Sequence, residues 1–278
     1  MKRLGFLGPD GTFTQQAALE YCRHNSRQMV EYAGIPDVIW AVASDKVDEG
    51  LVPIENSIEG AVNATMDMLA HEVDLFIVAE LVLPVHQCLM ARRGVDMGDI
   101  TDIFSHPQAL AQCQHFIHSN MPDVNVHNVY STAAAAKLVA ESDKPWAAIA
   151  MPSAAQRWGL NILVSDIQDM SGNATRFVVL SKELAQQGLH NKTSIIFSVE
   201  DTPGSLYHTL KVFADRGINL TRIESRPAKK MLGQYLFFVD LIGHSQDDIV
   251  RECLEIISNN SSFYKYLGSY PVWEGTIA

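Results

Sequence analysis

Apolar and polar positions alternate along the first two thirds of the chain in a repeating order of short strand, polar turn and helix. Residues 2–7 form an apolar run typical of a buried strand, and Ala17, Ala18, Tyr21 and Cys22 then recur at the spacing of one helix face. Further strands or strand ends are predicted at 51–52, 103–104, 124–130 and 147–150. Strands that alternate with helices predict an α/β fold with parallel sheets, whose ligands bind beyond the carboxyl ends of the strands.

The turns after these strands carry hydroxyl, amide, carboxyl or imidazole groups. The first turn, GPDGTFT, has glycines for a tight bend and threonines that can cap a helix, but it lacks the lysine of a Walker loop. The polar residues of the turns are Thr12, Thr14, Glu55, Asn56, Ser57, His106, Ser131 and Thr132. Any one turn is equally consistent with a plain helix cap, whereas several together favour a site for a carboxylate.

The stretch 170–180, MSGNATRFVVL, changes from polar to apolar within a few residues. Asn173, Thr175 and Arg176 lead directly into the buried-strand pattern of 177–180. An amide, a hydroxyl and a guanidinium are thereby predicted at the mouth of a core strand, which suits a small anion. The alternative interpretation is a solvated loop that feeds a strand.

The composition changes over 183–192, which predicts a linker into a second domain. Strands are predicted at 194–199, 219–227, 235–242 and 263–272, with a helix after the first and after the third. The order βαββαβ is the ferredoxin-like α+β pattern, whose sheet edge and uncovered face favour self-association. We therefore predict an α/β region at 1–182, joined by this linker to an α+β domain at 193–278.

Charge and composition exclude several classes of function. The chain has 278 residues and a formal net charge of -11, which argues against general nucleic-acid binding. No apolar run is typical of a signal peptide or a membrane span, and the four cysteines form no CxxC pair, so we expect a cytoplasmic protein with reduced thiols. Cys113 lies near His115 and His118, but a metal site there lacks a further ligand. We expect neither a metal nor an organic cofactor.

Five motifs follow one another in the order found in one enzyme family. GPDGTFT, VPIENSIEG, SHPQALAQC, NATRF and GINLTRIESRP together resemble prephenate dehydratase over nearly the whole chain, in its bacterial form with a C-terminal ACT regulatory domain. The resemblance implies two α/β lobes folded like a type II periplasmic binding protein, with the active site in the cleft between them. It also implies conversion of prephenate to phenylpyruvate, water and carbon dioxide in phenylalanine biosynthesis, with feedback inhibition by phenylalanine.

The resemblance implies roles for individual residues as well. Thr175 matches the family's essential threonine and is expected to donate to the departing hydroxyl group, with Glu55 and His106 as alternative relays for the proton. Loss of water and carbon dioxide makes the ring aromatic, so that no electron sink or metal is required. Arg176 is expected either to pair with a substrate carboxylate or to brace the lobes. The predicted substrate-binding residues are Thr12, Thr14, Asn56, Ser57, Ser131, Thr132, Asn173, Arg176 and Phe177.

The expected phenylalanine site lies between two copies of the ACT domain, which predicts a homodimer or homotetramer. In the regulatory loop, Ser205 replaces the alanine of the family's usual GALV sequence. The predicted site residues are Gly204, Ser205, Leu206, Asn219, Leu220, Glu224, Ser225, Arg226 and Pro227. Three alternatives stand beside this interpretation: a solute-binding protein of the same shape, a catalytically inactive amino-acid sensor, and an arogenate dehydratase.

Overall fold

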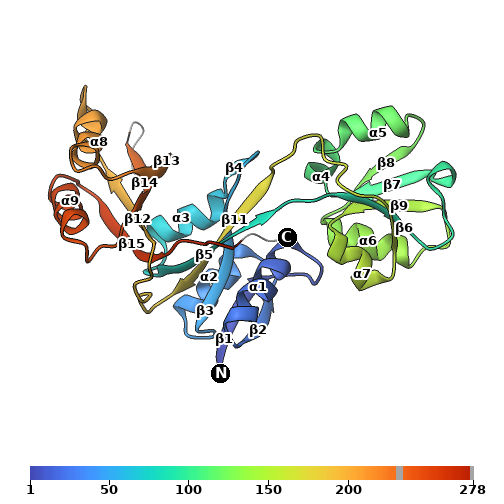
Figure 1. Ribbon diagram of the computed structural model, residues 1–278, viewed down its shortest axis with the longest axis horizontal. Coiled ribbons are helices and arrows are strands. Elements are labelled where there is room, and N and C mark those ends of the chain that lie inside the picture. The colour runs from blue at the N-terminus through green and yellow to red at the C-terminus, as the bar shows by residue number, and fades with distance from the viewer. Residues whose placement is uncertain (230–233, 276–278) are drawn as a thin grey trace.

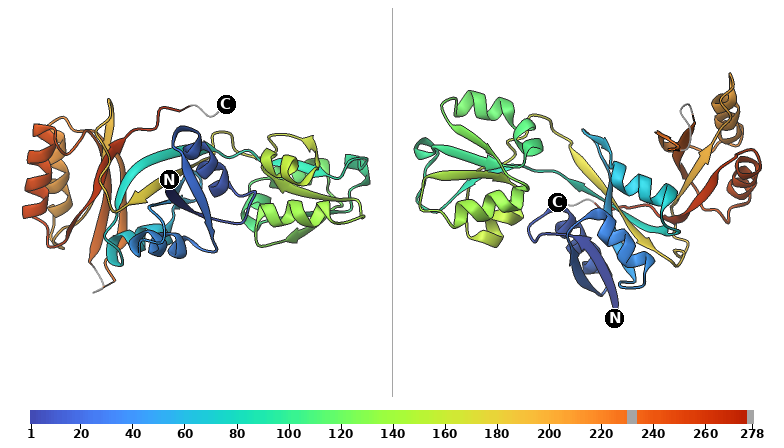
Figure 2. Two further views of the ribbon diagram at one scale, coloured as in Figure 1. Left: turned by 90° about the horizontal axis from the view of Figure 1, so that it is seen from below. Right: turned by 180° about the vertical axis from the view of Figure 1, so that it is seen from behind.

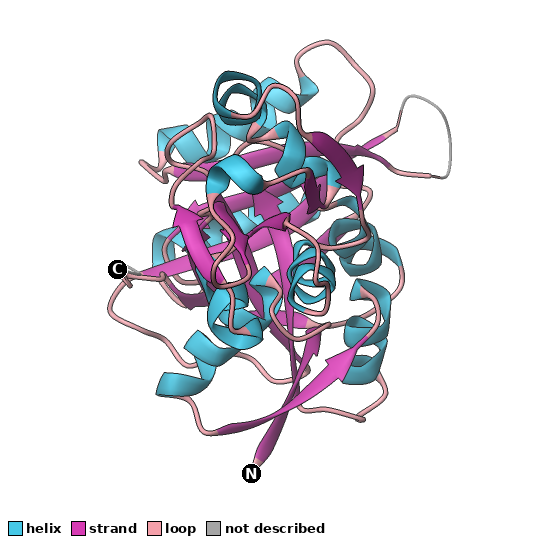
Figure 3. Cartoon of the chain, turned by 90° about the vertical axis from the view of Figure 1, so that its right-hand side faces the viewer, coloured by secondary structure: helices cyan, strands magenta, loops and turns pink. Residues whose placement is uncertain are grey.

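The computed structural model describes residues 1–229 and 234–275, which form two lobes and a C-terminal domain arranged in a row (Figure 1). Lobe 1, in the middle, combines residues 1–84 with the returning segment 174–181. Lobe 2 (88–164) lies on one side of lobe 1, and the C-terminal domain (191–275) lies on the other. The views from below and behind show the same order (Figure 2), and helices pack outside the sheets (Figure 3).

Lobe 1 is built on a sheet with the strand order β2-β1-β3-β11-β5 and the short β4 beside β3. Its elements are β1 (Lys2–Leu7), α1 (Phe13–His24), β2 (Arg27–Tyr32), α2 (Ile35–Ala43), β3 (Glu49–Asn56), β4 (Gly60–Ala61), α3 (Asn63–His71), β5 (Phe76–Pro84) and β11 (Ala174–Ser181). β1 is parallel to β2 and β3, whereas β11 is antiparallel to β3 and β5. The sheet of lobe 1 is therefore mixed, and the prediction of a parallel sheet is wrong for β11. This strand enters from lobe 2 and not through a crossover helix.

Lobe 2 has the strand order β10-β6-β9-β7-β8. Its elements are β6 (Cys88–Ala91), the 3₁₀ helix η1 (Met97–Asp99), β7 (Asp102–Ser105), α4 (Pro107–Ala111), α5 (Gln114–Asn120), β8 (Asn125–Asn128), α6 (Thr132–Ala140), β9 (Trp146–Ala150), α7 (Pro152–Trp158) and β10 (Asn161–Val164). β7 is parallel to β8 and β9, while β6 is antiparallel to β9 and β10. The segment after β7 forms two short helices, α4 and α5, and Cys113 lies between them as the N-cap of α5.

Two segments of the chain cross between the lobes, residues 85–87 and 165–173 (Figure 1). They are hydrogen-bonded to each other, because the Val85 N–H donates to the Asn173 carbonyl oxygen (2.8 Å) and the Ile167 N–H donates to that of Gln87 (2.9 Å). Two α/β lobes with such a double connection form the predicted fold, that of a type II periplasmic binding protein.

The C-terminal domain is ferredoxin-like, as predicted. Its sheet has the order β13-β14-β12-β15 and is antiparallel throughout. Its elements are β12 (Asn191–Ser198), α8 (Ser205–Asp215), β13 (Leu220–Pro227), β14 (Tyr235–Ile242), α9 (Asp248–Asn259) and β15 (Tyr264–Pro271). α8 and α9 pack on one face of this sheet around Phe213, Cys253 and Ile257.

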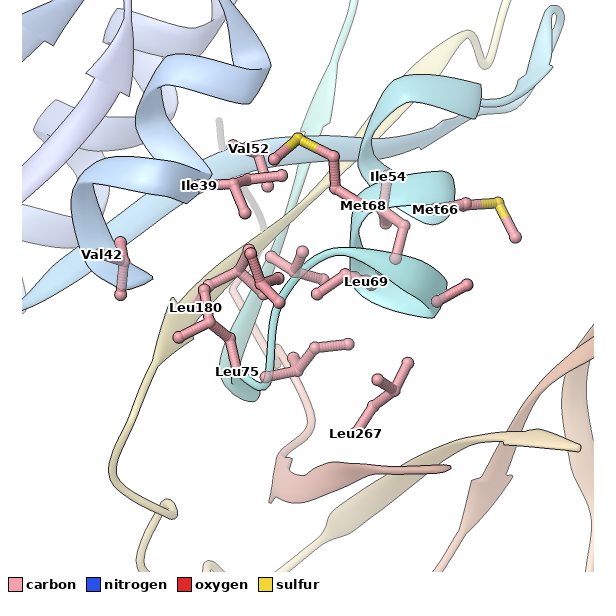
Figure 4. Close-up of a cluster of buried hydrophobic side chains, with 14 of the residues drawn as sticks. Ile39, Val42, Val52, Ile54, Met66, Met68, Leu69, Leu75, Leu180 and Leu267 are labelled. Atoms are coloured by element: carbon pink, nitrogen blue, oxygen red, sulfur yellow. The ribbon is translucent and has the colours of Figure 1, made fainter. Parts of the chain in front are cut away.

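Lobe 1 and the C-terminal domain share one apolar core. Leu69 of α3 and Leu180 of β11 lie in the same buried cluster as Leu267 of β15 (Figure 4). Gly268 brings the two sheets close together, because a Cβ atom there would lie 2.5 Å from the carbonyl oxygen of Ile77 in β5. The domain boundary in the sequence is therefore not a boundary between separate cores.

Candidate active site

A cleft of about 710 Å³ lies between the two lobes. It is lined by the end of β2, by the turns at the ends of β1, β3, β7 and β8, and by both crossing segments. Most of the residues predicted from the sequence line it, namely Thr12, Thr14, Asn56, His106, Ser131, Thr132, Asn173, Thr175 and Phe177. Glu55, Ser57 and Arg176 are not among the lining residues.

Thr175 is held by a fixed amide. The Asn56 Oδ1 atom accepts the backbone N–H groups of Ile58 (3.0 Å) and Glu59 (3.1 Å), so the other end of the amide, Nδ2, must face Thr175. This Nδ2 donates to Thr175 Oγ1 (3.0 Å) and to Asn173 Oδ1 (2.9 Å). The Thr175 hydroxyl accepts this bond and donates none to any residue that the structure describes. Its proton is therefore available to a group in the cleft.

The hydrogen bonds around Asn173 connect the two lobes. Asn173 lies at the end of the second crossing segment and is buried, and its Nδ2 donates to Gln112 Oε1 of lobe 2 (3.3 Å). Ser57 supports the same segment, because its hydroxyl accepts the Ala174 N–H (2.9 Å). Ser57 therefore positions the backbone next to Thr175 instead of lining the cleft.

The polar turns of the cleft also cap helices. Thr12 Oγ1 accepts the Gln15 N–H (3.3 Å) at the start of α1, and Ser131 Oγ accepts the Ala134 N–H (3.0 Å) at the start of α6. His106 Nδ1 accepts the Gln108 N–H (3.3 Å), which leaves the proton of the neutral imidazole on Nε2. The capping and the site interpretations are therefore compatible, because helices α1 and α6 present their N-terminal dipoles at the cleft.

Glu55 and Arg176 lie on the other face of the sheet. β3 continues to Asn56 instead of ending at 52, so that Glu55 and Asn56 are neighbours in a strand and point to opposite faces. The Oε2 atom of Glu55 lies 3.3 Å from the Nε atom of Arg222 in β13. Arg176 alternates with Thr175 in β11 in the same way. These positions contradict the proton relay expected of Glu55 and the substrate contact expected of Arg176.

Arg176 joins lobe 1 to the C-terminal domain. Its Nε contacts Glu80 of β5 (2.8 Å), while its terminal nitrogens contact Asp240 of β14 (2.5 Å) and Tyr270 of β15 (2.9 Å). Burial disfavours the charge of Arg176, but Asp240, Tyr270 and Glu80 offset this effect and raise its pKa above the usual value. Burial likewise opposes ionisation of Asp240, but Arg176 and Ser194 hold the Asp240 pKa below the usual value. Of the two roles expected for Arg176, the structural one agrees better with these contacts. Arg176 connects lobe 1 to the C-terminal domain, however, and not one lobe to the other.

Sequence reasoning missed five polar residues of the cleft, which are Glu31, Gln87, Gln108, Gln112 and Tyr130. Gln108 and Gln112 lie in the SHPQALAQC motif, of which the sequence analysis names only His106 as a candidate site residue. Glu31 is the second-last residue of β2, a strand that the sequence analysis does not predict. Its carboxylate lies over Gly8, where an added Cβ atom would lie 2.3 Å from it. Among the described residues that line the cleft there is no lysine or arginine. An anion in the cleft would meet neutral donors and helix dipoles, and one carboxylate, that of Glu31.

The predicted phenylalanine-site residues fall into three groups. Gly204, Ser205 and Leu206 line a pocket of about 360 Å³ with Tyr235 and Phe237. Asn219 and Leu220 lie at the other end of the sheet, beside the end of β14 at Ile242. One chain therefore does not bring Asn219 to Gly204.

β13, which contains the ESRP sequence Glu224–Pro227, is attached to lobe 1 by two ion pairs. Arg226 contacts Asp67 of α3 (2.7 Å), in addition to the pair between Arg222 and Glu55. The pair with Glu55 connects β13 to β3, the strand that carries Asn56.

Among residues 1–229 and 234–275, no helix has the length and apolarity needed to cross a membrane. The same residues contain no group of three or more His, Cys, Asp or Glu side chains that could hold a metal ion. Cys22, Cys88, Cys113 and Cys253 are free thiols, and all but Cys22 are buried.

A two-lobed α/β fold with a polar cleft, and with a ferredoxin-like domain packed behind it, defines a protein that binds a small molecule between its lobes. A model of the prephenate dehydratase family matches residues 4–185, and a model of the ACT domain matches residues 193–259. The chain belongs to the prephenate dehydratase family. This assignment supports a dehydratase over the solute-binding protein and the inactive sensor.

Similar proteins agree with the family match. The chain is 42% identical to a bifunctional chorismate mutase/prephenate dehydratase of Aquifex aeolicus, over 97% of the chain and 73% of that protein. It is 40% identical to a prephenate dehydratase of Methanocaldococcus jannaschii, over 96% of the chain and 97% of that protein. It also resembles the crystal structure of a prephenate dehydratase from Arthrobacter aurescens in complex with L-Phe, with a TM-score of 0.87 and 38% identity over 96% of this chain and 89% of that one.

Proposed function

We propose that the chain catalyses the decarboxylative dehydration of prephenate in the cleft between its lobes, with Thr175 as donor to the departing hydroxyl group. The observation that carries this assignment is the bond from Asn56 Nδ2 to Thr175 Oγ1, which leaves the threonine proton free toward the cleft. We assign catalysis to residues 1–182 and regulation to residues 193–278, joined by 183–192. We also propose a cytoplasmic location, which agrees with the four free thiols because the cytoplasm keeps cysteines reduced.

The reaction breaks two bonds of the substrate. The carbon–oxygen bond breaks and the hydroxyl group leaves as water with a proton from Thr175, while the electron pair of the carbon–carboxylate bond completes the aromatic ring. The hydrogen bond that Thr175 accepts from Asn56 polarises its hydroxyl and stabilises the alkoxide that forms. The alkoxide takes its proton back from solvent, and His106, which lines the same cleft, is the proposed relay for that proton.

Neutral donors suit the decarboxylation step. A lysine or arginine on the leaving carboxylate would stabilise the substrate more than the transition state, which would oppose loss of carbon dioxide. The remaining carboxylate is assigned to the N-terminal ends of α1 and α6, where Thr12, Thr14, Ser131 and Thr132 lie.

One incubation tests the proposed function. Purified protein is mixed with prephenate, and phenylpyruvate is followed by its absorbance in alkali, with and without phenylalanine. Parallel incubation with arogenate gives the ratio of the two kcat/KM values. Absence of phenylpyruvate from an otherwise folded protein would overturn the proposal.

Glu31 gives a prediction about substrate charge. Its carboxylate opposes the two negative charges of prephenate, so Glu31→Gln is expected to lower KM for prephenate about two- to fivefold in this solvated cleft. The KM for arogenate, which carries an ammonium group, is expected to rise or stay constant. Steady-state kinetics at low and high salt provide the measurement, and equal KM changes for both substrates would contradict the electrostatic explanation.

We further propose that phenylalanine binds between ACT domains of two copies, in a homodimer or homotetramer. The pocket at Gly204–Leu206 offers backbone N–H groups at the start of α8 for the amino-acid carboxylate. Asn219 and Leu220 of a second copy complete the site, because in one chain they lie at the far end of the sheet. Glu224 to Pro227 transmit the change to lobe 1 through β13. The effector inhibits only by favouring one arrangement of the domains over another.

Gly204→Val is expected to abolish inhibition by phenylalanine while kcat stays within about twofold. Gly204 has a φ of +89°, and an added Cβ atom would lie 3.3 Å from His208 Nε2, so a branched side chain distorts the turn that holds the carboxylate. Ser205→Ala, which restores the usual loop sequence, is the matched control and should remain inhibited. The measurement is the activity of both variants as a function of phenylalanine concentration. An inhibition curve of Gly204→Val that equals that of the parent would mean that phenylalanine binds elsewhere.

A further inference from the structure

The first crossing segment connects the end of β5 at Pro84 to the start of β6 at Cys88 (Figure 1). Gln87 is the last residue of this segment. Both polar groups of its backbone are bonded to the second crossing segment. Its N–H donates to Gln168 Oε1 (2.9 Å), and its carbonyl oxygen accepts the Ile167 N–H (2.9 Å). The position of Gln87 is therefore fixed by its backbone at the junction of the lobes, without help from its side chain.

The side-chain amide of Gln87 is buried without a partner. The residue is 2% exposed and lines the cleft together with Asn173 and Thr175. Its amide makes no hydrogen bond with any residue that the structure describes, and its Oε1 atom is sealed from solvent. Native proteins leave few buried polar groups unpaired, because each one loses its hydration without a bond in return.

Other amides of the cleft are different. Asn56 uses both ends of its amide, and Asn173 donates to Gln112 and accepts from Asn56. A glutamine that only filled space could be replaced by an apolar side chain of the same length with a gain in stability. The unpaired amide of Gln87 therefore points to a bond that forms only with a ligand in the cleft.

We propose that Gln87 is a substrate-binding residue that donates its amide N–H to an oxygen of prephenate. This inference rests on the proposed function and adds a residue to it. The sealed atom is Oε1, whereas Nε2 is not among the sealed atoms, so the donor can reach the cleft without movement of the backbone. Prephenate offers two carboxylates and a hydroxyl group, all of which accept hydrogen bonds. A neutral donor at the junction of the lobes binds such an oxygen without the strong field that would hold back the leaving carboxylate.

Gln87→Met tests the proposal, because methionine keeps the length and volume of the side chain and removes only the amide. We expect kcat/KM for prephenate to fall at least tenfold, while the melting temperature stays equal or rises. A residue with a structural role alone would not produce these opposite changes, since its removal lowers stability and activity together. A loss in kcat would show that the hydrogen bond from Gln87 strengthens in the transition state, whereas a rise in KM alone would show that it is equally strong in the bound substrate.

Gln168→Met is the matched control for stability. Gln168 accepts the Gln87 N–H from the other crossing segment, so its replacement is expected to lower the melting temperature. A Gln87→Met protein with kcat/KM within twofold of the parent overturns the inference. The inference also fails if Gln87→Met loses as much melting temperature as Gln168→Met. A folded parent that does not convert prephenate overturns the proposed function itself, whereas an active parent with an unaffected variant overturns the role of Gln87 alone.

Discussion

Thr175→Val lowers kcat by about 10²–10⁴-fold, the usual contribution of a positioned proton donor, and leaves the fold intact. Valine keeps the branched shape and the strand preference of threonine, so that only the hydroxyl is lost from β11. The Asn56 Nδ2 group still donates to Asn173 Oδ1 and to the Ala174 carbonyl oxygen, which limits the structural effect. The measurement is kcat for prephenate, with circular dichroism and a melting curve to verify the fold.

Thr175→Ser is the control for this prediction, because it returns the hydroxyl on a smaller side chain. Serine is expected to recover a large part of the activity that valine loses. If Thr175→Val keeps more than about a tenth of the parent kcat, which is a loss of under about 1.4 kcal/mol in transition-state stabilisation, another group supplies the proton.

Asp240→Asn is expected to destabilise the protein by about 3–5 kcal/mol, the usual effect of removing one partner from a buried ion pair. The carboxylate of Asp240 is nearly inaccessible and accepts hydrogen bonds from Arg176 and Ser194. The asparagine would leave the buried guanidinium of Arg176 with Glu80 at 2.8 Å and the more distant Glu55 at 3.8 Å. Denaturant unfolding followed by fluorescence measures the change.

Asp67→Asn provides the matched control for Asp240. Asp67 also forms ion pairs between lobe 1 and the C-terminal domain, with Arg226 and Lys229, but a quarter of its side chain is exposed. Solvent screening reduces the contribution of such pairs to about 1 kcal/mol or less. If both variants lose the same free energy of unfolding, burial is not what makes the Arg176 cluster strong.

The depressed pKa of Asp240 determines how this stability depends on pH. A carboxylate with a lower pKa in the folded state stabilises the protein fully above the pKa of the unfolded chain, which is about 3.9 for aspartate. This contribution is lost as the pH falls from that value through the folded-state pKa. The parent is therefore expected to lose stability below about pH 4, over a range in which the Asp240→Asn variant changes less.

The sequence predicts the elements of this fold better than their pairing. The βαββαβ order and the bounds of β14 follow from hydrophobic periodicity, and the ferredoxin-like sheet is confirmed. The direction of β11 does not follow from periodicity, because a strand that returns from another lobe has the same apolar pattern as one that follows a helix. Short strands such as β6 and β10 in lobe 2 have too few residues to show a period.

The candidate site shows a similar limit. Motif residues are adjacent in sequence, but consecutive residues of a strand face opposite ways, so Asn56 and Thr175 line the cleft while Glu55 and Arg176 face the C-terminal domain. In the sequence VPIENSIEG, proline and asparagine predict the end of a strand, but β3 continues through Asn56 and its side chains keep alternating between the two faces. Gln87 lies outside every motif that was considered, and its distinguishing property, an unpaired buried amide, exists only in the folded chain.

The core that lobe 1 shares with the C-terminal domain constrains how the chain folds during synthesis. β11 completes the sheet of lobe 1 only after all of lobe 2 has left the ribosome, and β15, near the end of the chain, covers the apolar side chains around Leu69 and Leu180. Contacts between such distant segments form slowly, because a long loop must close before they contribute. The nascent chain therefore exposes an uncovered apolar face until β15 has been synthesised. Chaperone binding to ribosome-bound chains that stop before residue 264 would be the cellular sign of this order.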